Sequence, residues 1–138
     1  MSYLLDTNVV SEIRKARPDE RVATWFESVD SGHLYLSVLV VGEIRQGIDR
    51  LNRRDPTQAA VFATWLAALK RSYADRVLDI DREIAETWGA LNAVRPLPVV
   101  DGLLAATALV HDLTLVTRDE HDLADTGVRV LDPFAQSH

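Results

Sequence analysis

The sequence contains no cysteine, and this absence excludes several functional classes. A chain without cysteine has no disulfide framework, no thiolate metal site and no thiol nucleophile. Long apolar runs are also missing, because the longest ones, 34–41 and 103–110, are short and each contains a Ser or Thr, so we expect no membrane span. No basic, cleavable leader precedes the first apolar segment, and we therefore expect a cytoplasmic protein.

Positive charge is scarce as well. The chain has 15 Lys and Arg against 21 Asp and Glu, which gives a formal net charge of −6 at pH 7. A field of this sign does not attract nucleic acid to the surface as a whole. Arginines still gather locally, at 14–17 and 50–54, where they either complete helix ends or form a local basic surface. The length of 138 residues predicts a single domain over 1–138.

Short apolar segments alternate with amphipathic ones along the chain. The apolar segments predict strands, and Tyr3-Leu4-Leu5, which lacks polar alternation, is typical of a strand buried on both faces. Two consecutive amphipathic segments between Val38 and Tyr73 predict an αα-hairpin. The alternation predicts an α/β fold with a small parallel sheet of four to five strands and helices on both faces. Strands are expected near 3–5, 33–37, 77–80, 113–117 and 127–131, and helices near 9–13, 18–27, 38–51, 56–73, 81–94 and 102–110.

Acidic residues stand just before three of the expected helices. They are Asp6, Asp101 and Asp119, and two of them closely follow an apolar strand. Asp is a favoured N-cap, so capping alone would explain all three. The carboxyl ends of parallel strands also meet at one edge of a sheet, where working residues collect. The sequence therefore leaves two interpretations of these acids, caps or a joint site.

Glu43 favours the joint site because it lies inside an expected helix and caps nothing. It sits at the border of the apolar helix face, beside Gly42 and one turn before Gly47. Each glycine is costly in a helix interior, by about 1 kcal/mol relative to Ala. We expect a close backbone approach beside Glu43 to explain both glycines. A plain surface Glu is the alternative, since Glu is a good helix former.

Four acids at one edge of a sheet would repel one another unless a cation lay among them. Carboxylate ligands without cysteine select a hard divalent ion, Mg²⁺ or Mn²⁺. Such an ion can activate a water molecule and neutralise charge on a phosphate. The sequence thus predicts phosphodiester hydrolysis, with Asp6 and Asp101 as the primary metal ligands and with Glu43 and Asp119 completing the pocket.

Four segments, in order along the chain, carry a resemblance to a known family. They are LLDTNVVSE from residue 4, VVGEIRQG from residue 40, VVDGLLAATAL from residue 99 and LVTRDEHDL from residue 115. Together they resemble the PIN domain, in particular VapC and FitB-like toxins of bacterial toxin–antitoxin pairs. The resemblance implies a Mg²⁺- or Mn²⁺-dependent ribonuclease. It also implies inhibition by a VapB- or FitA-like antitoxin, and we expect a homodimer in addition.

The resemblance also assigns residues by position. Asp6, Glu43 and Asp101 match the three acids best kept in the family. Asp119 or Asp122 supplies the fourth, and the sequence leaves that choice open. Asn8 and Thr117 match polar positions that orient a carboxylate or a water next to the metal.

Two other functions fit parts of the pattern. A metal-dependent phosphatase or receiver-like domain also places acids at strand ends, but it usually needs a lysine near the site, and no lysine follows a late strand here. A catalytically inactive PIN-like module would bind its partner without cutting RNA. The presence of all four acids ranks this second alternative below an active nuclease.

Overall fold

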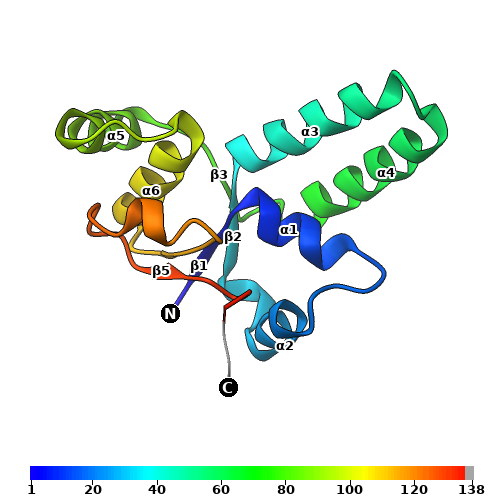
Figure 1. The fold of residues 1–138 in the computed structure, drawn as a ribbon, viewed down its shortest axis with the longest axis horizontal. Helices are drawn as coiled ribbons and strands as arrows, with labels where there is room; N and C mark the ends of the chain where they lie inside the picture. Colours follow the sequence, from blue (N-terminus) through cyan, green and yellow to red (C-terminus); the bar gives the residue numbers. More distant parts are fainter. Residues whose placement is uncertain (136–138) are drawn as a thin grey trace.

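The computed structural model describes residues 1–135. A five-stranded parallel sheet lies at the centre of the molecule (Figure 1). The strands are β1 (Tyr3–Leu5), β2 (Leu34–Ser37), β3 (Val77–Leu78), β4 (Thr114–Val116) and β5 (Val130–Leu131). The helices are α1 (Thr7–Arg14), α2 (Glu20–Ser28), α3 (Val38–Asn52), α4 (Pro56–Ser72), α5 (Arg82–Val94) and α6 (Val99–His111), with 3-10 turns η1 (Ser31–His33) and η2 (His121–Leu123).

The strand order, β3-β2-β1-β4-β5, determines where a site can form. The chain builds outward from β1 through β2 to β3, then returns to add β4 on the other side of β1. Such a reversal leaves a crevice at the carboxyl ends of the two strands that flank it, here β1 and β4. Leu4 and Leu5 on β1 are fully buried, as the unbroken apolar segment predicts.

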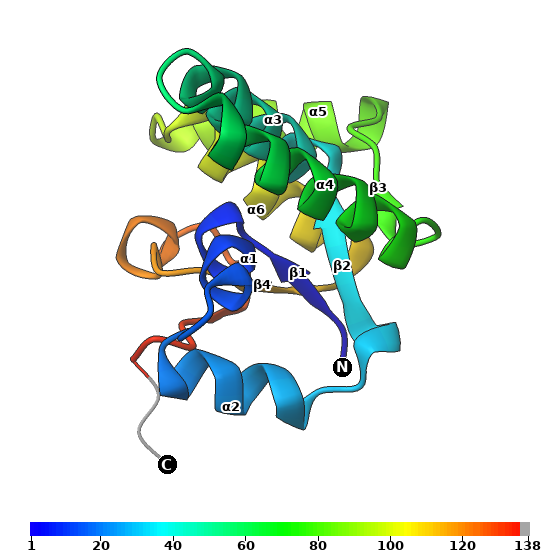
Figure 2. The same ribbon diagram turned by 90° about the vertical axis from the view of Figure 1, so that its right-hand side faces the viewer.

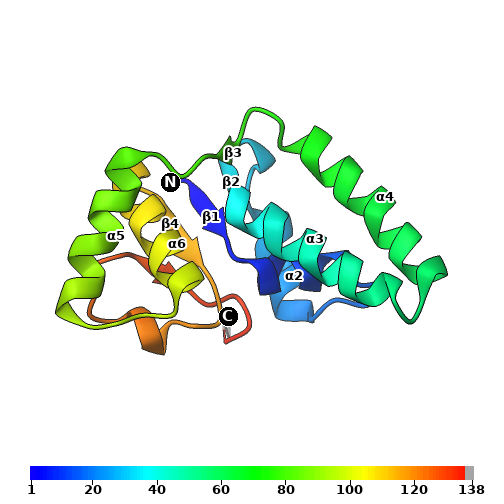
Figure 3. The same ribbon diagram turned by 90° about the horizontal axis from the view of Figure 1, so that it is seen from above.

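Helices cover the sheet on both sides. The strands lie between α5 with α6 on one side and α1 with the α3–α4 hairpin on the other (Figures 1 and 3). Figure 2 shows α2 on the opposite side of α1 from this hairpin. The expected α/β class, strand number and αα-hairpin are confirmed. None of the helices in residues 1–135 is both long and apolar enough to cross a membrane.

The start of α6 differs from the prediction. The sequence pattern placed the helix at Gly102, with Asp101 just ahead of it, but the helix begins at Val99. Pro98 occupies the N-cap with a φ of −52°, and its carbonyl accepts from the Gly102 N–H at 2.9 Å. Proline suits a helix start because it has no N–H that needs an intrahelical partner. Asp101 therefore lies inside the first turn of α6 and is not its cap.

Candidate metal centre

Three of the predicted acids meet at the carboxyl ends of β1 and β4. Asp6 follows β1, Asp119 lies shortly after β4, and Asp101 projects from the first turn of α6. One carboxylate oxygen from each lies within 4.8 Å of the other two. We call these three residues the acidic triad. Residues far apart in the sequence thus converge at the crevice that the strand order creates.

Two threonines hold Asp6 and Asp119 of the triad in place, one through its backbone N–H and one through its hydroxyl. Asp6 is only 6% exposed, and its Oδ1 accepts from the Thr7 N–H at 2.6 Å while its Oδ2 accepts from Thr117 Oγ1 at 2.6 Å. The same Thr117 oxygen accepts from the Asp119 N–H at 3.1 Å. Thr117 is itself buried, so one hydroxyl fixes Asp6 and the backbone of Asp119 together. These two hydrogen bonds connect Thr117, which the sequence predicts to be a supporting residue, to two of the predicted acids.

Glu43 lies beside the triad and outside its 4.8 Å group. Its Oε1 accepts from Thr7 Oγ1 at 2.5 Å, which ties α3 to the first residue of α1. Its charge contributes to raising the pKa of both Asp6 and Asp101. The structure therefore brings Glu43 to the same edge as the other acids, one residue away from Asp6 through Thr7.

Burial and mutual repulsion make the triad hard to ionise. Burial is the main cause that raises the pKa of Asp101 to about 6, and the charges of Asp119 and Asp6 raise it further. Burial also raises the pKa of Asp6, although the hydrogen bonds from Thr117 and Thr7 oppose that shift. The pKa of Asp119 rises for the same reasons, burial first and then the charge of Asp6. A bound cation would relieve this repulsion.

Helix capping explains only one of the three acids. Asp6 does cap α1, through the bond from the Thr7 N–H. The N-cap of α6 is Pro98, with no side-chain hydrogen bond, and that of η2 is Glu120. Asp101 and Asp119 therefore cap neither element. Capping cannot explain these two acids, and this favours the joint site.

The remaining sequence candidates differ in position. Asp122 is exposed and stays outside the triad, although its charge raises the pKa of Asp101 and Asp119. Asn8 lies close to Asp6 in α1, and its Oδ1 is buried with no hydrogen-bond partner in the described part of the chain.

The sequence analysis did not predict a role for Thr7, whose hydroxyl binds Glu43. Its position directly after Asp6, at the first residue of α1, was the available signal.

The donor set fits a hard divalent cation. All three triad groups offer carboxylate oxygens, and Mg²⁺ and Mn²⁺ prefer such ligands. Few protein ligands are needed, because Mg²⁺ usually keeps several of its waters. The pKa values of Asp101 and Asp119 are raised first by burial and then by neighbouring negative charges, and a cation between the acids would oppose both effects.

Known proteins resemble the chain over nearly its whole length. The family model described as the PIN domain matches residues 3–128. The chain is 31% identical over 136 residues to Toxin FitB of Neisseria gonorrhoeae, covering 95% of this chain and 97% of that protein. It is 33% identical over 139 residues to VapC ribonuclease Y4jK of Sinorhizobium fredii, covering 95% and 96%. The crystal structure of FitAcB from Neisseria gonorrhoeae matches with a TM-score of 0.89 at 31% identity, over 97% of this chain and 99% of that one.

Proposed function

Because the chain belongs to the PIN-domain family, we propose that it is a VapC-type ribonuclease toxin whose acidic triad binds Mg²⁺ or Mn²⁺. The observation that carries this proposal is the convergence of Asp6, Asp101 and Asp119 within 4.8 Å. A relative with this degree of similarity is named a ribonuclease, and another is named a toxin. RNA is then the substrate, and we infer that the protein acts in the cytoplasm.

Each acid has a proposed role. Asp6 and Asp101 hold the cation as primary ligands, and Asp119 completes the set in preference to the exposed Asp122. Bound there, the ion would supply a nucleophilic water near neutral pH and neutralise charge on the phosphate. Glu43, held by Thr7, lies where it can accept a hydrogen bond from a water at the edge of the triad. Thr117 keeps Asp6 oriented, and Asn8 offers a buried oxygen next to it.

The two rival functions have less support. A receiver-like phosphatase would belong to another family than the one that matches residues 3–128. An inactive binding module would have no need for acids that burial and repulsion make costly to ionise.

Asp6→Asn tests the proposal while leaving the cap intact. Asn caps a helix about as well as Asp, and the Thr117 hydroxyl can accept from the new amide. We expect the variant to fold with an unchanged circular dichroism spectrum and to lose Mn²⁺-dependent RNA cleavage. Cleavage at the wild-type rate by purified Asp6→Asn protein would contradict the assignment.

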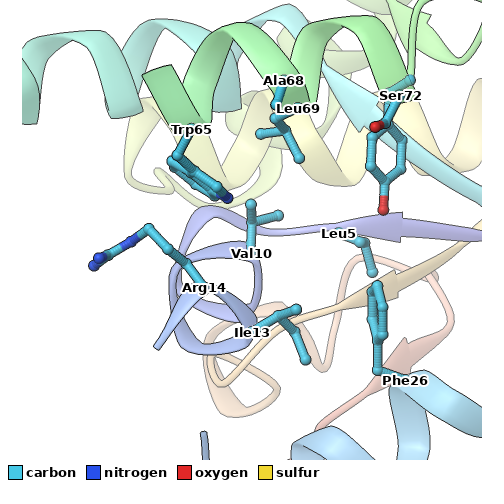
Figure 4. Close-up of a pocket in the computed structure, with 10 residues that line it drawn as sticks. Leu5, Val10, Ile13, Arg14, Phe26, Trp65, Ala68, Leu69 and Ser72 are labelled. Atoms are coloured by element: carbon cyan, nitrogen blue, oxygen red, sulfur yellow. The ribbon is translucent and has the colours of Figure 1, made fainter. Parts of the chain in front are cut away.

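An apolar pocket offers a site for the antitoxin. It has a volume of about 270 Å³ and lies between α1, α2 and α4, with Leu5, Phe26 and Leu69 in its lining (Figure 4). We propose that an apolar segment of a VapB- or FitA-like antitoxin binds here, close to the triad that it inhibits. We also retain the expected homodimer as a proposal, which light scattering of the purified protein tests directly.

A further inference from the structure

A second groove is lined by residues of α1, α3 and α4 and shares Arg14 and Trp65 with the apolar pocket. It has a volume of about 310 Å³, within the range of roughly 300–1,000 Å³ that small-ligand sites occupy. Thr7 and Glu43 are among its lining residues, and Thr7 directly follows Asp6 of the acidic triad. Four further lining residues supply positive charge, an aromatic ring or open space, and they are Arg14, Gly47, Arg54 and Trp65. We call these six residues the arginine groove.

We propose that the arginine groove binds the nucleotide that flanks the phosphate to be cleaved, an inference that rests on the proposed ribonuclease function. A nucleotide combines a phosphate with an aromatic base. A subsite for a nucleotide needs a cation to bind the phosphate and a flat side-chain face on which the base can stack. Both are present on the walls of this groove, which Thr7 and Glu43 also line.

The cations come from Arg14 and Arg54. Neither guanidinium makes an ion pair or a side-chain hydrogen bond among residues 1–135. Arg14 stacks its guanidinium carbon 4.1 Å from the centre of the Phe62 ring, which holds the group in place and leaves its N–H edge to donate. Figure 4 shows the Arg14 side chain extending away from the apolar pocket, next to Trp65. These cations offset the repulsion that the acids exert on an approaching strand.

The flat faces come from Trp65 and the stacked Arg14. The Trp65 ring is half-buried and lies 5.6 Å from the Arg14 guanidinium carbon. Bases stack on aromatic rings and on guanidinium planes whatever their sequence, and each such contact is worth roughly 1–3 kcal/mol. A single-stranded segment could therefore seat one base here without a fixed code.

Open space at Gly47 gives the groove its room. Gly47 lies one turn after Glu43 on α3, so the two positions share a helix face. A Cβ placed at Gly47 would meet nothing within 4 Å. A side chain at 47 would therefore start in the open space of the groove, and it would remove a glycine from a helix interior.

The test blocks the groove with Gly47→Leu and removes a cation with Arg54→Gln. Both residues line this groove and not the apolar pocket. Gly89→Leu and Arg82→Gln are matched controls, because Gly89 is also an exposed helical glycine with nothing within 4 Å, and both positions lie on the distant α5. Binding of a mixed-sequence single-stranded RNA of about 12 nucleotides is measured by fluorescence anisotropy with Mn²⁺, together with KM and kcat for its cleavage.

We expect Gly47→Leu and Arg54→Gln to weaken RNA binding and to raise KM by roughly tenfold, with a much smaller fall in kcat and no change in the Mn²⁺ requirement. The controls should match the wild type. Trp65→Phe gives a separate signature. It should abolish RNA-induced quenching of tryptophan fluorescence and change affinity little, since Phe still offers a face for stacking.

Wild-type RNA affinity and KM in Gly47→Leu and Arg54→Gln would overturn the inference. So would loss of antitoxin inhibition alone, because the groove would then belong to the protein partner. A raised Mn²⁺ requirement without a change in RNA binding would also overturn it. Failure of the proposed function looks different: the wild type would bind RNA without metal-dependent cleavage, or Asp101→Asn would cleave as the wild type does.

Discussion

Thr117 shows how a single hydroxyl can govern a charged site. It donates to Asp6 and accepts from the backbone of Asp119, so its removal leaves both acids less constrained. Thr117→Val should raise the pKa of Asp6, since that hydrogen bond lowers it, and increase the Mn²⁺ concentration needed for cleavage by roughly tenfold or more. Thr114→Val is the control, because Thr114 is a buried threonine on β4, the strand just before Thr117, and its hydroxyl accepts from Arg129 Nε at 3.4 Å instead of binding an acid of the triad. Equal Mn²⁺ requirements in the two variants would show that Thr117 does not position the acids.

Residue-scale features were only partly predictable from sequence. Glu43 could be singled out because an unexplained acid in a helix interior has no cap to form, and the structure brings it beside Asp6 through Thr7. The close backbone approach expected at Gly42 and Gly47 is wrong, because a Cβ at either position would meet nothing within 4 Å. A glycine shows only that no side chain is present. The sequence does not say whether a neighbouring backbone occupies that space or whether it stays open. The Thr7 bond to Glu43 depends on how α1 and α3 pack, which no local pattern encodes.

At the scale of the elements, Arg76 ties the end of α4 to the start of β2. Its guanidinium donates to the carbonyls of Ser31 at 2.6 Å, Leu34 at 2.8 Å and Ser72 at 2.8 Å. Arg76→Lys keeps the charge but not the planar fork, and should lower the free energy of unfolding by about 2 kcal/mol in urea titrations. Arg71→Lys, exposed on α4, should change it little. Equal stabilities of the two variants would show that these bonds contribute nothing.

The apolar pocket yields a prediction about the partner. Ala68 on α4 lines this pocket and is absent from the arginine groove. Ala68→Glu should prevent co-purification with the antitoxin encoded beside the toxin gene, because it places a charge in an apolar lining. RNA cleavage by the isolated variant should stay at the wild-type level. Retention of the antitoxin by Ala68→Glu would place its binding site elsewhere.

The positions of helices and strands were more predictable than the contacts of single residues, because hydrophobic periodicity and capping residues are local signals in the sequence. The strand β1 and the hairpin α3–α4 follow from an apolar segment and from amphipathic spacing. The error at α6 arose because Val99 and Val100 have the composition of a strand. Pro98 and the packing of α6 against α5 and β4 override that preference.

For the whole molecule, we expect the triad to couple stability to pH and, through the proposed cation, to metal. In the folded protein the pKa of Asp101 is about 6, against an ordinary value of 3.8, so the folded state binds the proton more tightly. Asp101 therefore stabilises the metal-free fold below pH about 4, and this contribution is lost as pH rises to about 6. Other carboxyls, such as Asp19 with a lowered pKa, act in the opposite direction, so the comparison must be with a variant.

Above pH about 6, metal-free Asp101→Asn should accordingly be more stable than the wild type, by about 1 kcal/mol or a few degrees in Tm. The gap should close as the pH falls toward 4, and Mn²⁺ should stabilise only the wild type. Thermal unfolding across this pH range, with a chelator and then with Mn²⁺, measures both effects. A gap that is independent of pH would contradict the repulsion inferred within the triad.

The most direct measurement is a calorimetric Mn²⁺ titration of the wild type, Asp101→Asn and Asp79→Asn, with RNA cleavage measured on the same samples. Asp79 is an exposed acid that follows β3 and lies outside the triad, so it controls for charge and for strand-end position. We predict that the wild type and Asp79→Asn bind Mn²⁺ equally and cleave RNA, whereas Asp101→Asn binds at least roughly tenfold more weakly and does not cleave. Equal Mn²⁺ affinity and equal cleavage in all three proteins would contradict a metal-dependent nuclease centred on these acids.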